Sequence, residues 1–204
     1  MMPTAGLCTL ILSCFAMLSK PQDSPITSTN FYTAYSDLKI IQYAEAHPKL
    51  DKRLAKVLMN PKTSIGLKAA IVNAMSWHID GKSNASLYGS YLREKYGITK
   101  LEPSADLSAA DNLVMGYFTV MDDYFHPEKA LPWLEKAVEL APRSHTAHLI
   151  LALARAQKAM DDNWCEVWKL YAAVDIRTDL TRELRADAVA VVEEYMVLYK
   201  EDCK

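Results

Sequence analysis

The chain contains few of the residues from which phosphate and cofactor sites are commonly built. Only 6 of its 204 residues are glycine, so little backbone is free to approach a ligand closely. Three motifs that mark large enzyme classes do not occur: the glycine-rich phosphate loop, the Gly-x-Ser-x-Gly elbow and the His-Glu-x-x-His pair. We therefore predict that the protein is not an enzyme and binds no cofactor.

The chain also lacks an excess of charge of either sign. Its 23 lysines and arginines nearly balance its 25 aspartates and glutamates, which gives a formal net charge of -2. A protein without a basic surface has neither the long-range attraction nor the counterion release that drives binding to polyanions. We therefore expect no nucleic-acid partner.

Cysteine is scarce, and its positions do not favour a disulfide. Of 4 cysteines, Cys8 and Cys14 fall in the apolar start of the chain. If Cys165 and Cys203 lie on the last two helices, they stand about 12 residues before the joining turn and about 24 after it, a mismatch of roughly 18 Å along the helices. A disulfide joins Cα atoms only about 4.4 to 6.8 Å apart. We therefore predict no bridge, and a buried thiol at Cys165.

Apolar residues at helical spacing are abundant. Half of the chain (50%) is apolar, and a folded chain of this length buries roughly 70% of the surface that its unfolded form exposes. The pattern predicts nine helices, and no comparable stretch alternates strictly enough to be a strand. The predicted helices are Phe31 to Ala46, Leu50 to Met59, Ile65 to Ile79, Ala85 to Tyr96, Ala105 to Phe125, Pro127 to Leu140, His145 to Met160, Asn163 to Ile176 and Leu180 to Lys200. Because the loops between them are short, we predict an all-α fold of antiparallel helical hairpins.

The first residues have the pattern of a targeting segment. No charged residue occurs between Met1 and Ser19, and the apolar run from Ala5 to Ala16 has the length of a signal-peptide core but is short for a membrane span. We predict that residues 1–20 are a signal peptide or anchor and that the protein is exported, to a periplasmic, extracellular or membrane-tethered location. Two alternatives stay open: a lipid anchor at Cys14, which would make the protein membrane-associated, and an uncleaved helix of a cytoplasmic protein.

Composition divides the rest of the chain into three parts. Residues 21–29 are rich in proline, serine and threonine, which is typical of a linker with no apolar face to bury. A second break, at Leu101 to Ser104, contains Pro103. We predict a linker over residues 21–29, an N-terminal helical region over 30–102 and a second helical region over 104–201.

The most specific pattern is the stretch EKALPWLEKAVELAP, residues 128–142. A small residue, Ala130, is followed by a large one at Leu134, a small one at Ala137 and a proline at Pro142. This pattern resembles the second helix of a tetratricopeptide repeat (TPR). In that arrangement the two alanines let a partner helix approach closely, the large residue fills the groove between them, and the proline ends the helix.

The resemblance extends more faintly in both directions. Large residues occupy the expected positions of the first helix at Val114, Tyr117 and Met121. Phe118, however, stands where a small residue is usual, which should widen or rotate the hairpin. A degenerate second repeat is indicated by the pair Leu151-Ala152, and the segment from Leu180 would cap the stack. The resemblance implies a short α-solenoid with one clear repeat, one degenerate repeat and a C-terminal capping helix.

In a TPR stack the first helix of each hairpin lines a concave groove. The resemblance assigns to this groove Asn112, Met115, Thr119, Asp122, Thr146, Leu149, Leu153 and Ala156. Because these residues are mostly apolar or acidic, they do not suit a basic clamp for a carboxylate, and the expected occupant is an apolar peptide or helix. The resemblance thus implies a non-catalytic protein–protein interaction scaffold. Lysine at Leu149 and Leu153 should then abolish binding and spare stability.

One alternative is a helical enzyme or metal-binding protein that uses His145, His148, Asp122 and His126. The first two are three residues apart on one predicted helix, a spacing at which histidines can share a zinc ion. No spacing fixes a third ligand, so histidines without a metal are the favoured interpretation, and we expect no bound metal. A further alternative is that the helices serve self-association alone.

Overall fold

The computed structural model describes residues 24–78 and 81–204, so the predicted signal peptide or anchor, with Cys8 and Cys14, lies outside the described residues. Within the described ranges the chain has nine α-helices, three short 3-10 helices and no strand, which confirms the predicted all-α fold class. The elements are η1 (Phe31–Tyr35), α1 (Lys39–Ala46), α2 (Lys52–Leu58), α3 (Ile65–Met75), α4 (Asn84–Tyr96), α5 (Ala109–Asp122), η2 (Pro127–Lys129), α6 (Leu131–Leu140), α7 (His145–Ala159), α8 (Trp164–Asp175), α9 (Ala186–Met196) and η3 (Val197–Asp202).

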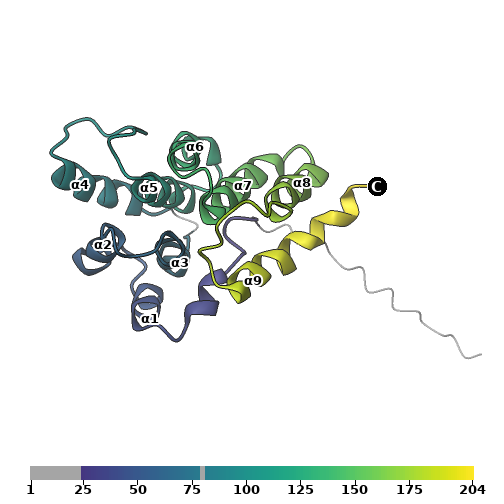
Figure 1. Ribbon diagram of the computed structural model, residues 1–204, viewed down its shortest axis with the longest axis horizontal. Helices are drawn as coiled ribbons and strands as arrows, with labels where there is room; N and C mark the ends of the chain where they lie inside the picture. Colours follow the sequence, from purple (N-terminus) through teal and green to yellow (C-terminus); the bar gives the residue numbers. More distant parts are fainter. Residues whose placement is uncertain (1–23, 79–80) are drawn as a thin grey trace, which may run out of the picture.

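The helices from α5 to α8 form one continuous group (Figure 1). α5 packs along α6, α7 packs along α8, and α6 also contacts α7. On the other side of this group α3 contacts both α5 and α7, with α1 and α2 beyond it. The start of α9 lies on that side too, where α9 packs against η1. The two ends of the described chain therefore cover the same face of the central helices.

The predicted helix from Phe31 to Ala46 is two elements, η1 and α1, because residues far along the chain hold the segment between them. Arg185 donates a hydrogen bond to the carbonyl oxygen of Ala34 at 2.8 Å and forms an ion pair with Asp37. The hydroxyl of Tyr35 accepts a hydrogen bond from the backbone N–H of Arg185 at 2.9 Å. These contacts join residues about 150 positions apart, so helical periodicity could not reveal the break.

The predicted linker is part of the fold over its described residues, 24–29. Ile26 and Thr29 are fully buried. The carbonyl oxygen of Thr29 accepts a hydrogen bond from Nδ2 of Asn73 in α3 at 3.1 Å. The prediction of a solvated linker does not hold here, because one apolar residue is a weak sequence signal and its burial depends on helices that come later in the chain.

The two predicted helical regions share one core. Their buried apolar side chains form a single contiguous cluster. Across the predicted boundary, Nδ2 of Asn73 donates to the hydroxyl oxygen of Tyr117 at 3.0 Å, and burial raises the pKa of the Tyr117 phenol, which keeps it neutral. The break in composition at Leu101 to Ser104 therefore marks a loop and not a division between two cores.

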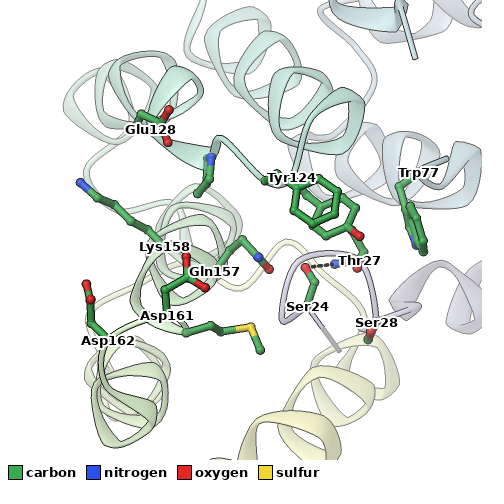
Figure 2. Close-up of a pocket in the computed structure, with 13 residues that line it drawn as sticks. Ser24, Thr27, Ser28, Trp77, Tyr124, Glu128, Gln157, Lys158, Asp161 and Asp162 are labelled. Atoms are coloured by element: carbon green, nitrogen blue, oxygen red, sulfur yellow. Dashed lines mark hydrogen bonds between the residues drawn. The ribbon is translucent and has the colours of Figure 1, made fainter. Parts of the chain in front are cut away.

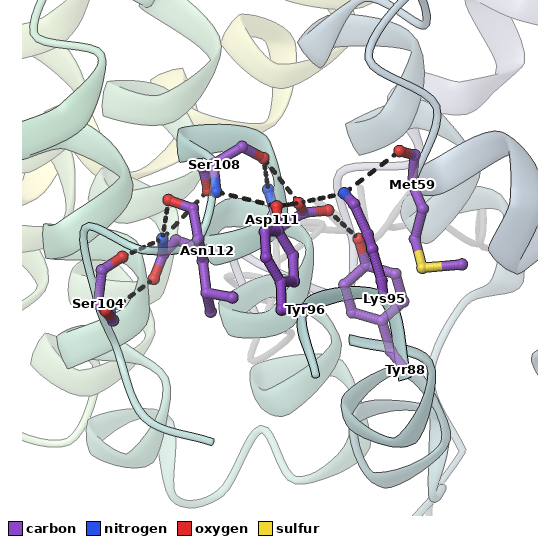
Figure 3. Close-up of polar contacts among 9 residues, drawn as sticks. Met59, Tyr88, Lys95, Tyr96, Ser104, Ser108, Asp111 and Asn112 are labelled. Atoms are coloured by element: carbon purple, nitrogen blue, oxygen red, sulfur yellow. Dashed lines mark hydrogen bonds and ion pairs between the residues drawn. The ribbon is translucent and has the colours of Figure 1, made fainter. Parts of the chain in front are cut away.

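A buried carboxylate joins α4 to the start of α5. Asp111 is fully buried, and four donors surround it in Figure 3: the hydroxyls of Tyr88 (2.7 Å), Ser108 (2.8 Å) and Tyr96 and the ammonium of Lys95 (2.8 Å). Burial alone would raise the pKa of Asp111, but these hydrogen bonds lower it below its ordinary value. Because a carboxylate has about four acceptor positions, the chain's own donors fill it, and we interpret the network as structural.

α5 and α6 approach each other closely at a glycine that the TPR pattern does not single out. A Cβ added to Gly116 would lie 2.8 Å from both Cγ and Cδ2 of Leu134. Ala130 and Ala137, the small residues of the EKALPWLEKAVELAP stretch, are fully buried. Gly116, two positions before Phe118, is therefore the residue at which α5 lies close to Leu134 of α6.

Replacing Gly116 with alanine tests this contact. Alanine has the higher helix propensity, by about 1 kcal/mol, so in open space the substitution would stabilise the protein. Because the added methyl group would collide with Leu134, we expect instead that the free energy of unfolding falls by roughly 1 to 3 kcal/mol, measured by urea denaturation. A gain in stability would contradict the close contact.

Cys165 and Cys203 form a disulfide, contrary to the prediction, with their Cα atoms 4.7 Å apart. The prediction assumed that the last helix begins at Leu180, directly after the turn. Instead α9 begins at Ala186 and contacts η1, and the irregular residues 176–185 separate it from the end of α8. Because of this offset, η3 packs along α8 and reaches its first turn, where Cys165 lies. The bridge thus ties the C-terminal segment to α8.

Candidate binding cavity

A cavity of about 550 Å³ opens where the ends of three helices meet (Figure 2). Its walls are residues at or just after the C-terminal ends of α3, α5 and α7, together with η2 and the turn at Ser24–Ser28 that precedes η1. These segments lie together because α3 packs against both α5 and α7. The volume suits a few residues of a peptide, since ligand sites commonly measure about 300 to 1,000 Å³.

One wall of the cavity is aromatic. Trp77 follows α3, and Tyr124 and Phe125 follow α5. The Trp77 ring meets the Tyr124 ring edge to face with centroids 5.1 Å apart, and Tyr124 stacks on Phe125 at 4.3 Å. These ring contacts hold each other in place, yet Phe125 is still 65% exposed. A fixed and exposed ring beside a cavity is a surface on which an apolar group can be buried.

The opposite side of the cavity is polar and mainly acidic. Glu128 comes from η2, Asp161 and Asp162 from the turn after α7, and Lys158 from the last turn of α7. Within the described part of the chain none of these four side chains forms an ion pair. In Figure 2 the side chain of Lys158 extends away from the aromatic wall, whereas Asp161 points toward Gln157 and the middle of the cavity.

Gln157 lies between the acidic and the aromatic sides (Figure 2). Its Oε1 atom is buried and accepts no hydrogen bond from the described part of the chain. A buried acceptor that has no donor costs about 1 to 3 kcal/mol, so a donor brought by a ligand would be favoured at this position.

The backbone after α3 sets the position of Trp77. Ser76 has a φ of 58°, in the left-handed region, and so turns the chain out of the helix. The ammonium of Lys82 donates to the carbonyl oxygens of Met75 and of Ser76, the latter at 2.9 Å. Burial lowers the pKa of Lys82, and the nearby Asp122 opposes that shift. The end of α3 therefore has its own cation.

The residues predicted to line a concave groove do not form an open surface. Five of the eight are buried: Asn112, Thr146, Leu149, Leu153 and Ala156. α3 contacts α5 and α7 on this side, so the N-terminal helices fill the space that the central helices alone would leave open. Lysine at Leu149 or Leu153 would place a charge in the core, so these substitutions report on folding and not on partner binding.

The polar members of the predicted groove bind within the chain. Nδ2 of Asn112 donates to the carbonyl oxygen of Ser104 at 3.0 Å, and Oγ1 of Thr146 donates to Oε2 of Glu183 at 3.0 Å. The other three members of the set are half-buried: Met115, Thr119 and Asp122. The sequence pattern could not show that other helices of the chain cover these residues.

The residues of the alternative metal site are not brought together as ligands. The candidates are His145, His148, Asp122 and His126. Oδ2 of Asp122 accepts a hydrogen bond from the N–H of Ala85 at the start of α4 (2.7 Å), whereas His126 pairs with Asp123 (3.0 Å). His145 is buried at the start of α7. Among the described residues no group of three or more His, Cys, Asp and Glu could hold a metal ion.

His145 makes stability depend on pH. Its side chain is buried, and burial lowers its pKa below the ordinary value of 6.5. At a pH between the pKa of His145 in the folded chain and its pKa in the unfolded chain, the unfolded chain binds a proton that the folded chain does not bind. The contribution of His145 to stability is therefore fully present above pH 6.5 and is lost as the pH falls toward the folded pKa. We expect urea denaturation between pH 7.5 and about 5 to give a wild-type slope up to about 1.4 kcal/mol per pH unit steeper than that of His145→Gln. Parallel curves would contradict this role.

The aromatic wall is absent from the set of residues predicted from the sequence. Trp77 falls inside the predicted helix Ile65 to Ile79, and Tyr124 and Phe125 fall inside the predicted helix Ala105 to Phe125, whereas α3 ends at Met75 and α5 at Asp122. The contact between Trp77 and the pair Tyr124-Phe125 depends on the packing of α3 against α5, which a single sequence does not reveal.

Comparison with known proteins assigns no family. No family model, curated protein sequence or solved structure matches the chain. Within residues 24–78 and 81–204 no helix is both long and apolar enough to cross a membrane.

Proposed function

We propose that the protein is a non-catalytic protein–protein interaction scaffold that binds a segment of a partner at the cavity between α3, α5 and α7. The observation that carries this proposal is the aromatic wall, where Phe125 is 65% exposed although its ring stacks on Tyr124. Binding energy in interfaces concentrates on aromatic side chains at well-packed pockets. Because these rings are already held in place, their side chains would lose little conformational entropy when a partner binds.

In this proposal the central helices are TPR-like. α5 with α6 and α7 with α8 would be two helical hairpins of a short α-solenoid, with α9 as the C-terminal cap. The packing within each pair, the contact between α6 and α7, and the burial of Ala130 and Ala137 support this interpretation. Because α3 covers the inner face, the docking site lies at the edge of the stack, where the helices end.

We also propose that the protein works in an oxidising compartment. Disulfides persist in secreted and periplasmic proteins and are rare in the cytosol, where thiols are kept reduced. The bridge between Cys165 and Cys203 supports export for this reason, and the apolar run from Ala5 to Ala16 is consistent with it.

Charging the aromatic wall tests the docking site. We expect that Phe125→Asp lowers the amount of partner captured from the native source by about tenfold or more, because a central aromatic contact is commonly worth at least about 1.4 kcal/mol. Stability should change by no more than about 0.5 kcal/mol, since the ring is mostly exposed. Capture is measured by affinity purification and quantitative mass spectrometry.

The matched control is Ile176→Asp, which charges a side chain that is 76% exposed at the end of α8 and does not line the cavity. It should capture the same partners as the wild type. Equal capture by Phe125→Asp and the wild type, or an equal loss in both variants, would contradict the proposed site.

A further inference from the structure

The charges around the cavity favour a cation. Glu128, Asp161 and Asp162 line it and form no ion pair within the described part of the chain. Lys158 is the one basic residue among the described lining residues, and its side chain extends away from the aromatic wall in Figure 2. A positive group that enters the cavity therefore meets carboxylates that the chain has not already neutralised.

The backbone contributes to the same field. The C-terminal ends of α5 and α7 border the cavity, and the helix dipole gives such ends a partial negative charge. The neighbouring end of α3 shows what fits there, because the ammonium of Lys82 donates to its carbonyl oxygens at Met75 and Ser76. The chain itself thus satisfies one of the three converging helix ends with a cation.

The aromatic wall and Gln157 narrow the choice among cations. A guanidinium group is flat, stacks on aromatic rings and donates several hydrogen bonds in its own plane. Oε1 of Gln157 is a buried acceptor without a donor in the described chain, and it lies between the aromatic wall and Asp161 in Figure 2. One arginine side chain can therefore stack on the aromatic wall and donate hydrogen bonds to Oε1 of Gln157 and to the carboxylate of Asp161.

We propose that the partner segment is basic and places an arginine side chain between the aromatic wall and Asp161. This inference rests on the proposed function and names the chemistry of the segment that the same cavity takes. The cavity of about 550 Å³ is large enough for an arginine side chain with its flanking backbone.

Two peptides that differ only in charge provide the test. The arginine probe is acetyl-Gly-Arg-Gly-amide, and in the second probe citrulline, a neutral analogue of the same shape, replaces arginine. Each is titrated to millimolar concentration into the ¹⁵N-labelled protein and followed by NMR spectroscopy. The indole N–H signal of Trp77 is assigned by its absence from the spectrum of Trp77→Phe, and its shift reports binding. We expect the arginine peptide to bind about tenfold more tightly than the citrulline peptide.

Asp161→Asn should remove this preference for arginine, because it deletes the carboxylate and keeps the shape of the side chain. Glu94→Gln, which deletes a charge on the exposed side of α4, should retain the preference. Equal binding of the two peptides to the wild type, or an unchanged preference in Asp161→Asn, overturns the basic segment and leaves the docking function standing. No shift of Trp77 with either peptide also overturns the basic segment, and capture by Phe125→Asp then decides the docking function separately.

Discussion

Asn73 in α3 makes three hydrogen bonds inside the core, and the arrangement of the rest of the chain follows from them. Its Oδ1 accepts from the backbone N–H of Tyr32 at 2.9 Å, and its Nδ2 donates to the carbonyl oxygen of Thr29 at 3.1 Å and to the hydroxyl of Tyr117 at 3.0 Å. Each of these groups would cost about 1 to 3 kcal/mol if it were buried without a partner. One side chain thus binds the N-terminal segment, α3 and α5 to one another.

This junction determines where a ligand can bind. With α3 held against α5 and α7, the inner face of the central helices is covered and Leu149 and Leu153 belong to the core. The same packing brings the C-terminal ends of α3, α5 and α7 to one edge, where aromatic side chains and carboxylates surround a cavity. The accessible site therefore lies at the helix ends and not along the helix faces.

Local patterns in the sequence were sufficient for the fold class and for the helices. Helical spacing predicted every α-helix, and the stretch from Glu128 to Pro142 contains two alanines, Ala130 and Ala137, that are fully buried. The features that these local patterns could not predict depend on contacts between residues that are far apart in the sequence. Arg185 divides the first predicted helix in two, and the offset start of α9 brings Cys203 to Cys165.

The candidate site was beyond sequence reasoning for the same reason. The TPR resemblance proposed a groove along α5 and α7, but whether this side is open depends on the packing of α3 against both helices. The described part of the segment that composition marked as a linker has Ile26 as its one apolar residue. The residues of the aromatic wall fall inside helices predicted from the sequence, and the contact between the Trp77 and Tyr124 rings depends on how the chain folds.

Hydrogen exchange at the backbone amide of Tyr32 tests most directly whether Asn73 holds the N-terminal segment to α3. This amide donates to Oδ1 of Asn73, so it should exchange about as slowly as the amides of α7, such as that of Leu153, which open only when the core unfolds. If the amide of Tyr32 exchanges at the rate of an unfolded chain while α7 stays protected, Asn73 does not hold this junction, and the account of how the chain is arranged around α3 is contradicted.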